Sequence, residues 1–497
     1  MTRTMLCQDT LAAVSRSLPT PAYDRSSLRA GIVHIGVGAF HRSHQAVVVD
    51  ELLAQGKARD WAICGVGLLD SDRGMRDVMR IQDCLYTTVV KHPDGRKDAR
   101  VIGSIVDYLF APDDPKAVLE RMAHPDVRIV SLTITEGGYN FDRVTGDFVI
   151  GTPAVARDIE AGATPSTVFA YVVEALRRRR DRDIPPFTVM SCDNIQGNGD
   201  IARRMFLSFA EYKDPGLAGW IRDNVAFPNS MVDRITPVTS LADVTDVESL
   251  LGVRDAGPVV CEPFFQWVLE DSFTLGRPPL EDAGVQMVDD VTPYELMKLR
   301  LLNVSHQGLC YFGYLSGYRS AHEASSDPAI AEFLLSYMRN EAIPTLLPVP
   351  GIDLDRYCRQ LIDRFQNPEV KDTLARLCAE SSDRIPTWLL PVVREQLAGA
   401  GAVTLSAAIV ASWARYAEAT DERGDPIDVV DPLKDQLVAI AQTQRSNPLA
   451  FIENRALFGD LADDPRFTGP YLAALIALFT VGAHGTVRSL TSPRSAP

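Results

Sequence analysis

Short, predominantly apolar runs alternate with amphipathic stretches over the first part of the chain. Each run is bounded by glycine or by polar turn residues, which is typical of strands buried on both faces of a parallel sheet. Between the runs, apolar positions recur three and four residues apart, which predicts helices. The predicted strands are residues 31–38, 61–69, 127–135 and 187–192, and the predicted helices are residues 40–56, 73–82 and 165–180.

The later part of the chain has a different pattern, because strand patterns become scarce and helical periodicity dominates. This change predicts an α/β domain over residues 1–285 and a mainly α-helical domain over residues 286–497. Within the first domain, residues 86–92 and 101–106 flank a Pro-Asp-Gly turn and predict a hairpin. The helical segments of the second domain are residues 292–314, 328–340, 354–365, 368–379, 390–398, 404–418, 433–442 and 470–480.

Composition places the chain among ordinary globular proteins. Of its 497 residues, 46% are hydrophobic and 23% are charged. The formal net charge is −15, so we expect no nucleic-acid partner, since phosphate would be repelled. No uninterrupted apolar run approaches the ~20 residues that a bilayer span needs. The N-terminus lacks the apolar region of a signal peptide, so we expect no membrane association.

The cysteines and histidines favour a metal-free protein of a reducing compartment. The eight cysteines are scattered without a Cys-x-x-Cys pair, which favours reduced thiols in the cytoplasm over a disulfide framework or a structural zinc. His41 and His44 are the only close histidine pair, and no His-Glu-x-x-His motif accompanies them. We therefore predict no metal site.

A glycine turn follows the first predicted strand. The order of strand, Gly36-x-Gly38 and helix is how a dinucleotide-binding unit begins, because the first glycine permits a tight turn and the second lets the backbone approach a pyrophosphate. The third glycine of the usual pattern is missing, and His41 stands in its place. The predicted cofactor-binding segment is Gly36, Val37, Gly38, Ala39 and Phe40.

Polar side chains follow the later strands, at the edge where ligands bind in open α/β sheets. Asp72 comes just after the second strand, where an acid holds the ribose of NAD; it could equally cap the helix at 73–82, and the two roles are compatible. Glu136 follows the third strand and is a candidate cofactor contact. Asn194 follows the fourth, where its amide could donate to an oxyanion or simply belong to a turn.

A second constellation lies in the first helix of the C-terminal domain, which we expect to open at Thr292 with Glu295 completing a capping box. On an α-helix, Lys298, His306 and Asn303 lie at about 0°, 80° and 140° around the axis. An amine, an imidazole and an amide on one broad face can move a proton to or from an alcohol oxygen. The alternative is an ordinary solvated helix face.

Together these motifs make the chain resemble the polyol-specific long-chain dehydrogenase/reductase family from about residue 31 to residue 484. The resemblance implies a Rossmann-type N-terminal domain, a mainly helical C-terminal domain, a site in the cleft between them, NAD as the cofactor and no metal. The motifs that carry it are IVHIGVGAFHRSHQ (32–45), SLTITEGGY (131–139), TVMSCDN (188–194), FPNSMVDRITP (227–237), CEPFFQWVLED (261–271), DDVTPYELMKLRLLNVSH (289–306) and PVPGIDL (348–354).

The resemblance also assigns roles to the candidate residues. Lys298 matches the general base of the family's Lys-x-x-x-x-Asn-x-x-His motif, and Asn194 and Asn303 match two amides that polarise the reacting oxygen. His306 matches a histidine that binds and orients the substrate. Glu295 is similar to a glutamate tied to proton exchange between the lysine and solvent, a role that competes with capping.

Substrate contacts are implied at Asp233 and, less directly, at Arg376 and Arg384. The chain departs from the family pattern at two positions. Val304 replaces the usual glycine beside the catalytic asparagine, which bears on substrate choice. Ser71 stands where some relatives carry a second acid, which bears on how strongly NADP is excluded.

The expected activity is reversible oxidation of an acyclic polyol, with D-mannitol to D-fructose as the leading pair. D-arabinitol or sorbitol dehydrogenase, or a fructuronate-type hexuronate reductase, are the alternatives on the same scaffold. A rival of another class is a dinucleotide-binding sensor without catalysis, which the intact lysine motif argues against. We expect no partner beyond the small-molecule substrate, and a monomer.

Overall fold

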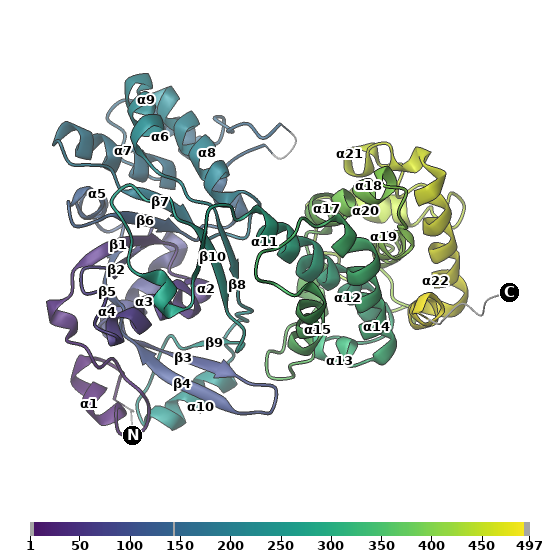
Figure 1. The fold of residues 1–497 in the computed structure, drawn as a ribbon, viewed down its shortest axis with the longest axis horizontal. Helices are drawn as coiled ribbons and strands as arrows, with labels where there is room; N and C mark the ends of the chain where they lie inside the picture. The colour runs from purple at the N-terminus through teal and green to yellow at the C-terminus, as the bar shows by residue number, and fades with distance from the viewer. Residues whose placement is uncertain (1–3, 143–144, 492–497) are drawn as a thin grey trace. The chain divides into compact units, whose positions relative to one another are not determined.

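The computed structural model describes residues 4–142 and 145–491 (Figure 1). The chain divides into two compact units, Met1–Thr292 and Pro293–Pro497. We call them the N-terminal and the C-terminal unit and describe each by itself.

The N-terminal unit is built on a five-stranded parallel sheet with the order β5-β2-β1-β6-β7. Ile35 at the end of β1 lies opposite Val66 and Leu132, so the carboxyl ends of these strands share one edge. Every residue of β1, β2, β6 and β7 is buried, which confirms the predicted doubly covered sheet. The strands are β1 (Ala30–Ile35), β2 (Ala62–Gly67), β5 (Ile105–Phe110), β6 (Ile129–Leu132) and β7 (Thr188–Ser191).

Alternate strand residues face opposite layers of the core. Val33 of β1 joins a cluster with Phe169 and Phe206 from the helices on one face, whereas Ile32 joins a cluster with Leu52 on the other. This arrangement is the Rossmann-type layering that the alternating pattern predicts. The longer helices of the unit are α3 (Gln45–Ala54), α4 (Arg73–Ile81), α5 (Pro115–Ala123), α6 (Pro153–Ile159), α7 (Val168–Asp181), α8 (Asn198–Lys213), α9 (Pro215–Asn224) and α10 (Leu241–Leu251), and α1 (Leu11–Val14) is short.

Two predictions for this unit are wrong: the extent of one helix and the position of one hairpin strand. The helix expected over 40–56 is broken into α2 (Ala39–Ser43) and α3, because His44 leaves helical geometry with φ −119° and ψ −94°. The second hairpin strand is β4 (Lys97–Ile102) rather than 101–106, and it pairs with β3 (Tyr86–Lys91). Residues 101–106 instead carry the chain from that hairpin into β5 of the main sheet.

Two smaller sheets complete the unit. Strand β9 (Val259–Cys261) adds to the β3–β4 hairpin. Strand β10 (Gln266–Glu270) lies between β8 (Ser230–Asp233) and β11 (Gln286–Val288). Strand β8 ends at Asp233, one of the predicted substrate contacts.

The C-terminal unit is mainly helical, as predicted, and is organised around α12, which packs against α14, α16 and α19. The helix expected over 368–379 is short, since only Leu374–Cys378 is helical. Its main elements are α11 (Thr292–Met297), η6 (Lys298–Asn303), α12 (Val304–Leu315), α13 (Ala321–Ser325), α14 (Pro328–Tyr337), α15 (Leu354–Phe365), α16 (Leu374–Cys378), α17 (Ser381–Arg384), α18 (Leu390–Ala398), α19 (Thr404–Tyr416), α20 (Lys434–Ala441), α21 (Arg455–Phe458) and α22 (Pro465–Thr491).

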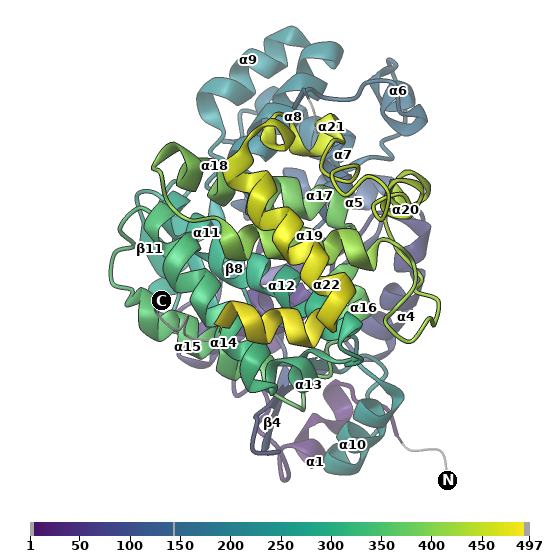
Figure 2. The same cartoon turned by 90° about the vertical axis from the view of Figure 1, so that its right-hand side faces the viewer.

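Helix α22 lies across α19 (Figure 2). Within the described residues it is the one helix long and apolar enough to cross a membrane by length and composition. It is not a continuous rod, because Gly482 (φ 75°, ψ 175°) breaks the helical path. Its buried side chains, such as Tyr471 and Leu475, lie on the helix that packs against α19 and α14 of the C-terminal unit.

Candidate functional site

The predicted cofactor-binding segment forms a bare backbone turn at the carboxyl end of β1. Gly36 has φ +93°, and a Cβ added there would come 2.1 Å from the carbonyl oxygen of Thr133. Gly38 precedes α2 and has open space around it, with only the Gly36 oxygen at 4.0 Å. The turn therefore requires glycine at the first position and leaves room for a ligand at the second.

Two stacked histidines lie beneath this turn. The rings of His34 and His41 are parallel within 9°, with centroids 3.4 Å apart, and both are fully buried. The His34 ring nitrogens contact the hydroxyls of Ser131 at 2.8 Å and Thr133 at 3.0 Å. Burial lowers the pKa of His34 to about 3 and holds the pKa of His41 well below its usual range, so both rings are neutral.

The stack explains the missing third glycine. That glycine normally allows close packing of helix on strand. Here the flat ring of His41, on α2, lies directly against the ring of His34, on β1, so close packing is kept with a side chain present. The sequence signal for this pair is a histidine on each side of the glycine turn.

Asp72 lies past the end of β2, as predicted. Its carboxylate accepts the N–H of Leu69 at 2.9 Å, so it bonds back to the turn rather than capping α4. Gly67 makes room for it, because a Cβ there would come 2.8 Å from the Asp72 Cβ and 2.4 Å from the Tyr108 hydroxyl. Asp72 therefore sits at the strand edge, where a ribose would be held.

Glu136 and Asn194 lie at the ends of two neighbouring strands, β6 and β7. The residue just before Asn194 is Asp193, whose buried carboxylate accepts the backbone N–H groups of Ile134 at 3.1 Å and Thr135 at 2.8 Å. Burial raises the pKa of Asp193 above its usual range. The structure thus ties the segment before Glu136 to the segment before Asn194.

Asp233 is the last residue of β8 and is buried. The next residue, Arg234, donates to the carbonyl oxygens of Ser43 at 2.7 Å and Glu262 at 3.2 Å. Those bonds fix the chain just after Asp233 against α2 and the β9 end. The Val-Asp-Arg motif therefore has a structural part, Arg234, next to the candidate substrate contact.

The lysine motif is wound differently from the prediction. Residues Lys298–Asn303 form a π-helical segment, η6, between α11 and α12, rather than part of one long α-helix. A π-helix bonds residues five apart, so Lys298 and Asn303 lie on the same side of the segment instead of about 140° apart. Both side chains are buried, at 6% and 4% exposure, so the interpretation as a solvated face is wrong.

Two further predicted residues flank this segment. Glu295 lies on α11, one turn before Lys298, and is buried. The side chain that accepts the Thr292 N–H at the start of α11 is that of Asp290, at 2.9 Å. His306 lies on α12, and its ring packs on Phe365 with centroids 4.6 Å apart.

The two candidate substrate arginines differ in their surroundings. Arg376 forms a fork with both carboxylate oxygens of Asp372, at 2.7 and 2.5 Å. Arg384 donates to the carbonyl oxygen of Leu377 at 3.0 Å, which also accepts a longer bond, at 3.5 Å, from Gln307 next to His306. Arg384 is therefore tied to the helix that carries the lysine motif, whereas the charge of Arg376 is already neutralised.

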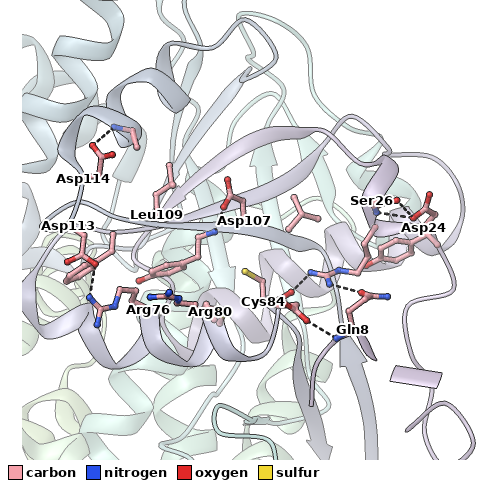
Figure 3. Close-up of a pocket in the computed structure, with 18 residues that line it drawn as sticks. Gln8, Asp24, Ser26, Arg76, Arg80, Cys84, Asp107, Leu109, Asp113 and Asp114 are labelled. Atoms are coloured by element: carbon pink, nitrogen blue, oxygen red, sulfur yellow. Dashed lines mark hydrogen bonds and ion pairs between the residues drawn. The ribbon is translucent and has the colours of Figure 1, made fainter. Parts of the chain in front are cut away.

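A groove of about 830 Å³ lies along the edge strand β5 (Figure 3). None of the predicted site residues lines it. Its charged groups have local partners, such as Arg76 with Asp113 at 2.7 Å and Arg25 with Gln8 at 3.1 Å. The groove therefore offers no acid–base constellation.

Among residues 4–142 and 145–491, no group of three or more His, Cys, Asp or Glu side chains is placed to hold a metal ion. The predicted site residues form two sets, each within its own unit. The N-terminal set is Gly36, Val37, Gly38, Ala39, Phe40, Asp72, Glu136, Asn194 and Asp233, and the C-terminal set is Glu295, Lys298, Asn303, His306, Arg376 and Arg384.

Both units match models of one protein family. Residues 30–282 match the mannitol dehydrogenase Rossmann domain, and residues 290–478 match the mannitol dehydrogenase C-terminal domain. The chain belongs to the mannitol dehydrogenase family.

Relatives match it over nearly its full length. A mannitol 2-dehydrogenase of Phaeosphaeria nodorum is 46% identical over 95% of this chain and 83% of the relative. A mannitol dehydrogenase of Saccharomyces cerevisiae is 43% identical over 98% of both chains.

Two solved structures of the family are also similar. Pseudomonas fluorescens mannitol 2-dehydrogenase, in a ternary complex with NAD and D-mannitol, has a TM-score of 0.89 and 41% identity, covering 99% of this chain and 100% of the other. A D-sorbitol dehydrogenase in substrate-free form has a TM-score of 0.90 and 39% identity, covering 97% of this chain and 100% of the other.

We predict that Gly36→Ala weakens dinucleotide binding at least ~10-fold, or ~1.4 kcal/mol, measured by NADH fluorescence titration. The reason is that a Cβ would collide with the Thr133 oxygen and disfavour the positive φ, so the turn must move. Gly219→Ala is the matched control, because Gly219 lies inside α9 with nothing within 4 Å of its added Cβ. Equal affinity of the two variants would contradict this role of the turn.

Proposed function

We propose that this protein is an NAD-dependent polyol dehydrogenase that oxidises a secondary alcohol of an acyclic polyol, with D-mannitol and D-fructose as the leading substrate pair. The observation that carries the proposal is the burial of Lys298 and Asn303 on one side of the π-helical segment η6. Family membership supports it, and so does the solved relative that binds NAD and D-mannitol.

The N-terminal unit supplies the cofactor contacts. The Gly36–Gly38 turn fits a dinucleotide, since its backbone is bare where a pyrophosphate approaches. Asp72 would accept hydrogen bonds from the adenosine ribose. Bound NAD⁺ would take up the hydride released from the substrate carbon.

The C-terminal unit supplies the base. Lys298 accepts the proton of the reacting hydroxyl, which requires that part of the lysine population be uncharged at working pH. Asn303 lies on the same side of η6 and donates a hydrogen bond to the oxygen as negative charge develops on it. Glu295, one turn earlier on α11, exchanges the proton onward, and His306 orients the substrate.

Asn194 of the N-terminal unit is the second donor to the developing oxyanion. Asp233, at the end of β8, contacts one substrate hydroxyl, and Arg384 donates a hydrogen bond to another hydroxyl. We also propose a cytoplasmic, monomeric and metal-independent enzyme, in line with the eight free cysteines.

A second candidate substrate is sorbitol. The observation that favours it is the 39% identical D-sorbitol dehydrogenase, whose chain is covered completely. Val304 is buried where the family motif has glycine. Its side chain adds bulk beside Asn303 and bears on which polyol the site accepts. D-arabinitol and a hexuronate remain further alternatives on the same scaffold.

A substrate panel tests the proposal. NADH absorbance is followed with D-mannitol, sorbitol, D-arabinitol and, in the reverse direction, D-fructose and fructuronate. We expect the highest kcat/KM for D-mannitol and D-fructose. A protein that binds NADH but turns over none of these substrates would instead be a dinucleotide sensor.

We predict that Lys298→Ala lowers kcat at least ~10²-fold, the scale of general-base catalysis, and leaves NADH binding nearly intact. Added small primary amines should restore part of the rate, because they replace the missing base. Lys434→Ala is the control, since Lys434 is an exposed lysine of the same unit paired with Asp428. Turnover of Lys298→Ala within about tenfold of wild type would exclude the lysine as the base.

We predict that the cofactor is NAD rather than NADP and that Asp72 is the main reason. The variant Asp72→Asn keeps an oxygen that can accept the Leu69 N–H but removes the charge that repels the 2′-phosphate. The ratio of NADP to NAD efficiency should rise at least ~10-fold, or ~1.4 kcal/mol. Because Ser71 is not an acid, wild type should retain measurable NADP activity.

Asp77→Asn is the matched control for this prediction. Asp77 is an exposed acid of α4, the helix that follows Asp72, and pairs with Arg76. It should leave the cofactor ratio unchanged. If Asp72→Asn behaved in the same way, Asp72 would be only a turn-stabilising residue.

A further inference from the structure

Two motif segments of the N-terminal unit, residues 193–200 and 227–233, are locked together by a buried amide. Asn198 is fully buried at the start of α8. Its Nδ2 donates to the carbonyl oxygens of Asp193 at 3.0 Å and Ser230 at 2.8 Å, and its Oδ1 accepts the Ser230 N–H at 2.9 Å. One side chain therefore joins the segment after β7 to the start of β8.

The same contact is reinforced by close backbone approach. A Cβ on Gly199 would come 2.5 Å from the Pro228 oxygen and 2.6 Å from the Phe227 oxygen, so only glycine fits there. Asn229 adds two bonds between the same segments: its Oδ1 accepts the N–H groups of Gly199 at 2.9 Å and Asp200 at 3.1 Å. The first turn of α8 is thus capped by the neighbouring motif.

A buried carboxylate extends the lock to β6. Asp193 accepts the N–H groups of Ile134 and Thr135, and the Tyr139 hydroxyl at 2.8 Å. The Tyr139 hydroxyl also lies 2.6 Å from the Ser191 hydroxyl. Thr135 is held at φ +61°, a strained conformation that such surrounding bonds maintain.

The lock therefore fixes three chain segments that carry proposed site residues. Glu136 follows the β6 end, Asn194 follows β7, and Asp233 ends β8. Asn194 is itself exposed, and it stands between the two locked residues Asp193 and Asn198. Its position is thus determined by groups on either side of it that are buried and hydrogen-bonded.

We propose that Asp193 and Asn198 are positioning residues, which place the Asn194 amide relative to Glu136 and Asp233. The inference rests on the proposed function, in which that amide donates to the reacting oxygen. Such a donor acts only when it is preorganised at the place where charge develops. A shift of about 1 Å at a reacting group can cost ~10²-fold in rate.

The decisive variant is Asn198→Asp. It keeps the size and the acceptor for the Ser230 N–H, but it sets a carboxylate oxygen against the carbonyl oxygens of Asp193 and Ser230. We expect kcat to fall ~10- to 10²-fold, with NADH affinity close to wild type. The isotope effect on kcat with polyol deuterated at the reacting carbon should rise, because hydride transfer is the step that slows.

A milder variant keeps the test decisive if Asn198→Asp does not fold. Tyr139→Phe removes one hydroxyl from Asp193 and leaves its two backbone bonds in place. It should lower kcat by a smaller factor, again with NADH affinity retained. Asp158→Asn is the control, because Asp158 is an equally buried carboxylate that bonds Ser166 and Thr167 before α7, outside the lock.

The control should lower the melting temperature and leave kcat and the isotope effect unchanged. If the folded lock variants behave like Asp158→Asn, the lock is only structural and the inference is wrong. If wild type itself turns over no polyol in the substrate panel, the proposed function has failed. The two failures are distinguished by the wild-type rate, which is measured first.

Discussion

The parallel sheet of the N-terminal unit is covered by apolar side chains on both faces, and this constraint determines where polar chemistry can lie. Strands β1, β2, β6 and β7 are wholly buried, so polar groups can reach a ligand only at the strand ends. The glycine turn, Asp72, Glu136 and Asn194 all follow carboxyl ends. Backbone N–H groups beyond the strand ends need hydrogen-bond acceptors, and the Asp193 carboxylate accepts two such groups.

The described part of the C-terminal unit, up to residue 491, has no such edge and gathers its polar groups by a change of helical winding. Residues Lys298–Asn303 leave the α-helix for a π-helical turn, a feature that is rare and frequently occurs at functional sites. The change brings Lys298 and Asn303 to one side of the segment, and both side chains are buried. An amine and an amide buried together in this way support a role in proton transfer.

The parts of the fold that follow from burial pattern were predictable from the sequence. The apolar runs located the main strands to within a few residues because each strand is buried on both faces. The error at residues 101–106 arose because a run of apolar residues there spans the end of β4 and the start of β5, which belong to different sheets. Periodicity assumes one helix type, so it could not show the π-helical turn or the break at His44.

The candidate catalytic residues could be named from the sequence by their residue type. The residues that hold them in place could not. Lys298, Asn303 and Asn194 could be named from motif spacing, whereas Asp193 and Asn198 could not. Those two residues act through backbone groups of segments that are distant in sequence, and a single sequence gives no sign of which carbonyl a buried amide meets. The stack of His34 on His41 has a sequence signal, a histidine on each side of the glycine turn, but the stacking itself depends on how α2 returns to β1.

The carboxylate partners of the two candidate substrate arginines, Arg376 and Arg384, bear on whether the substrate itself carries a charge. A hexuronate carries a carboxylate and needs an available cation, whereas a polyol needs only hydrogen-bond donors and acceptors. Arg376 already forms a two-bond fork with Asp372. Arg384 has a more distant carboxylate partner, Glu380, at 3.4 Å. It also donates to the Leu377 carbonyl oxygen, which accepts a second bond from Gln307 on α12.

Asp372 already balances the charge of Arg376, so a uronate carboxylate at Arg376 would share this cation with a second anion. Arg384 can donate a hydrogen bond to a neutral hydroxyl without losing its bond to Leu377, because a guanidinium carries five N–H donors. Both candidate arginines therefore already have carboxylate partners, which is consistent with an uncharged polyol rather than a uronate.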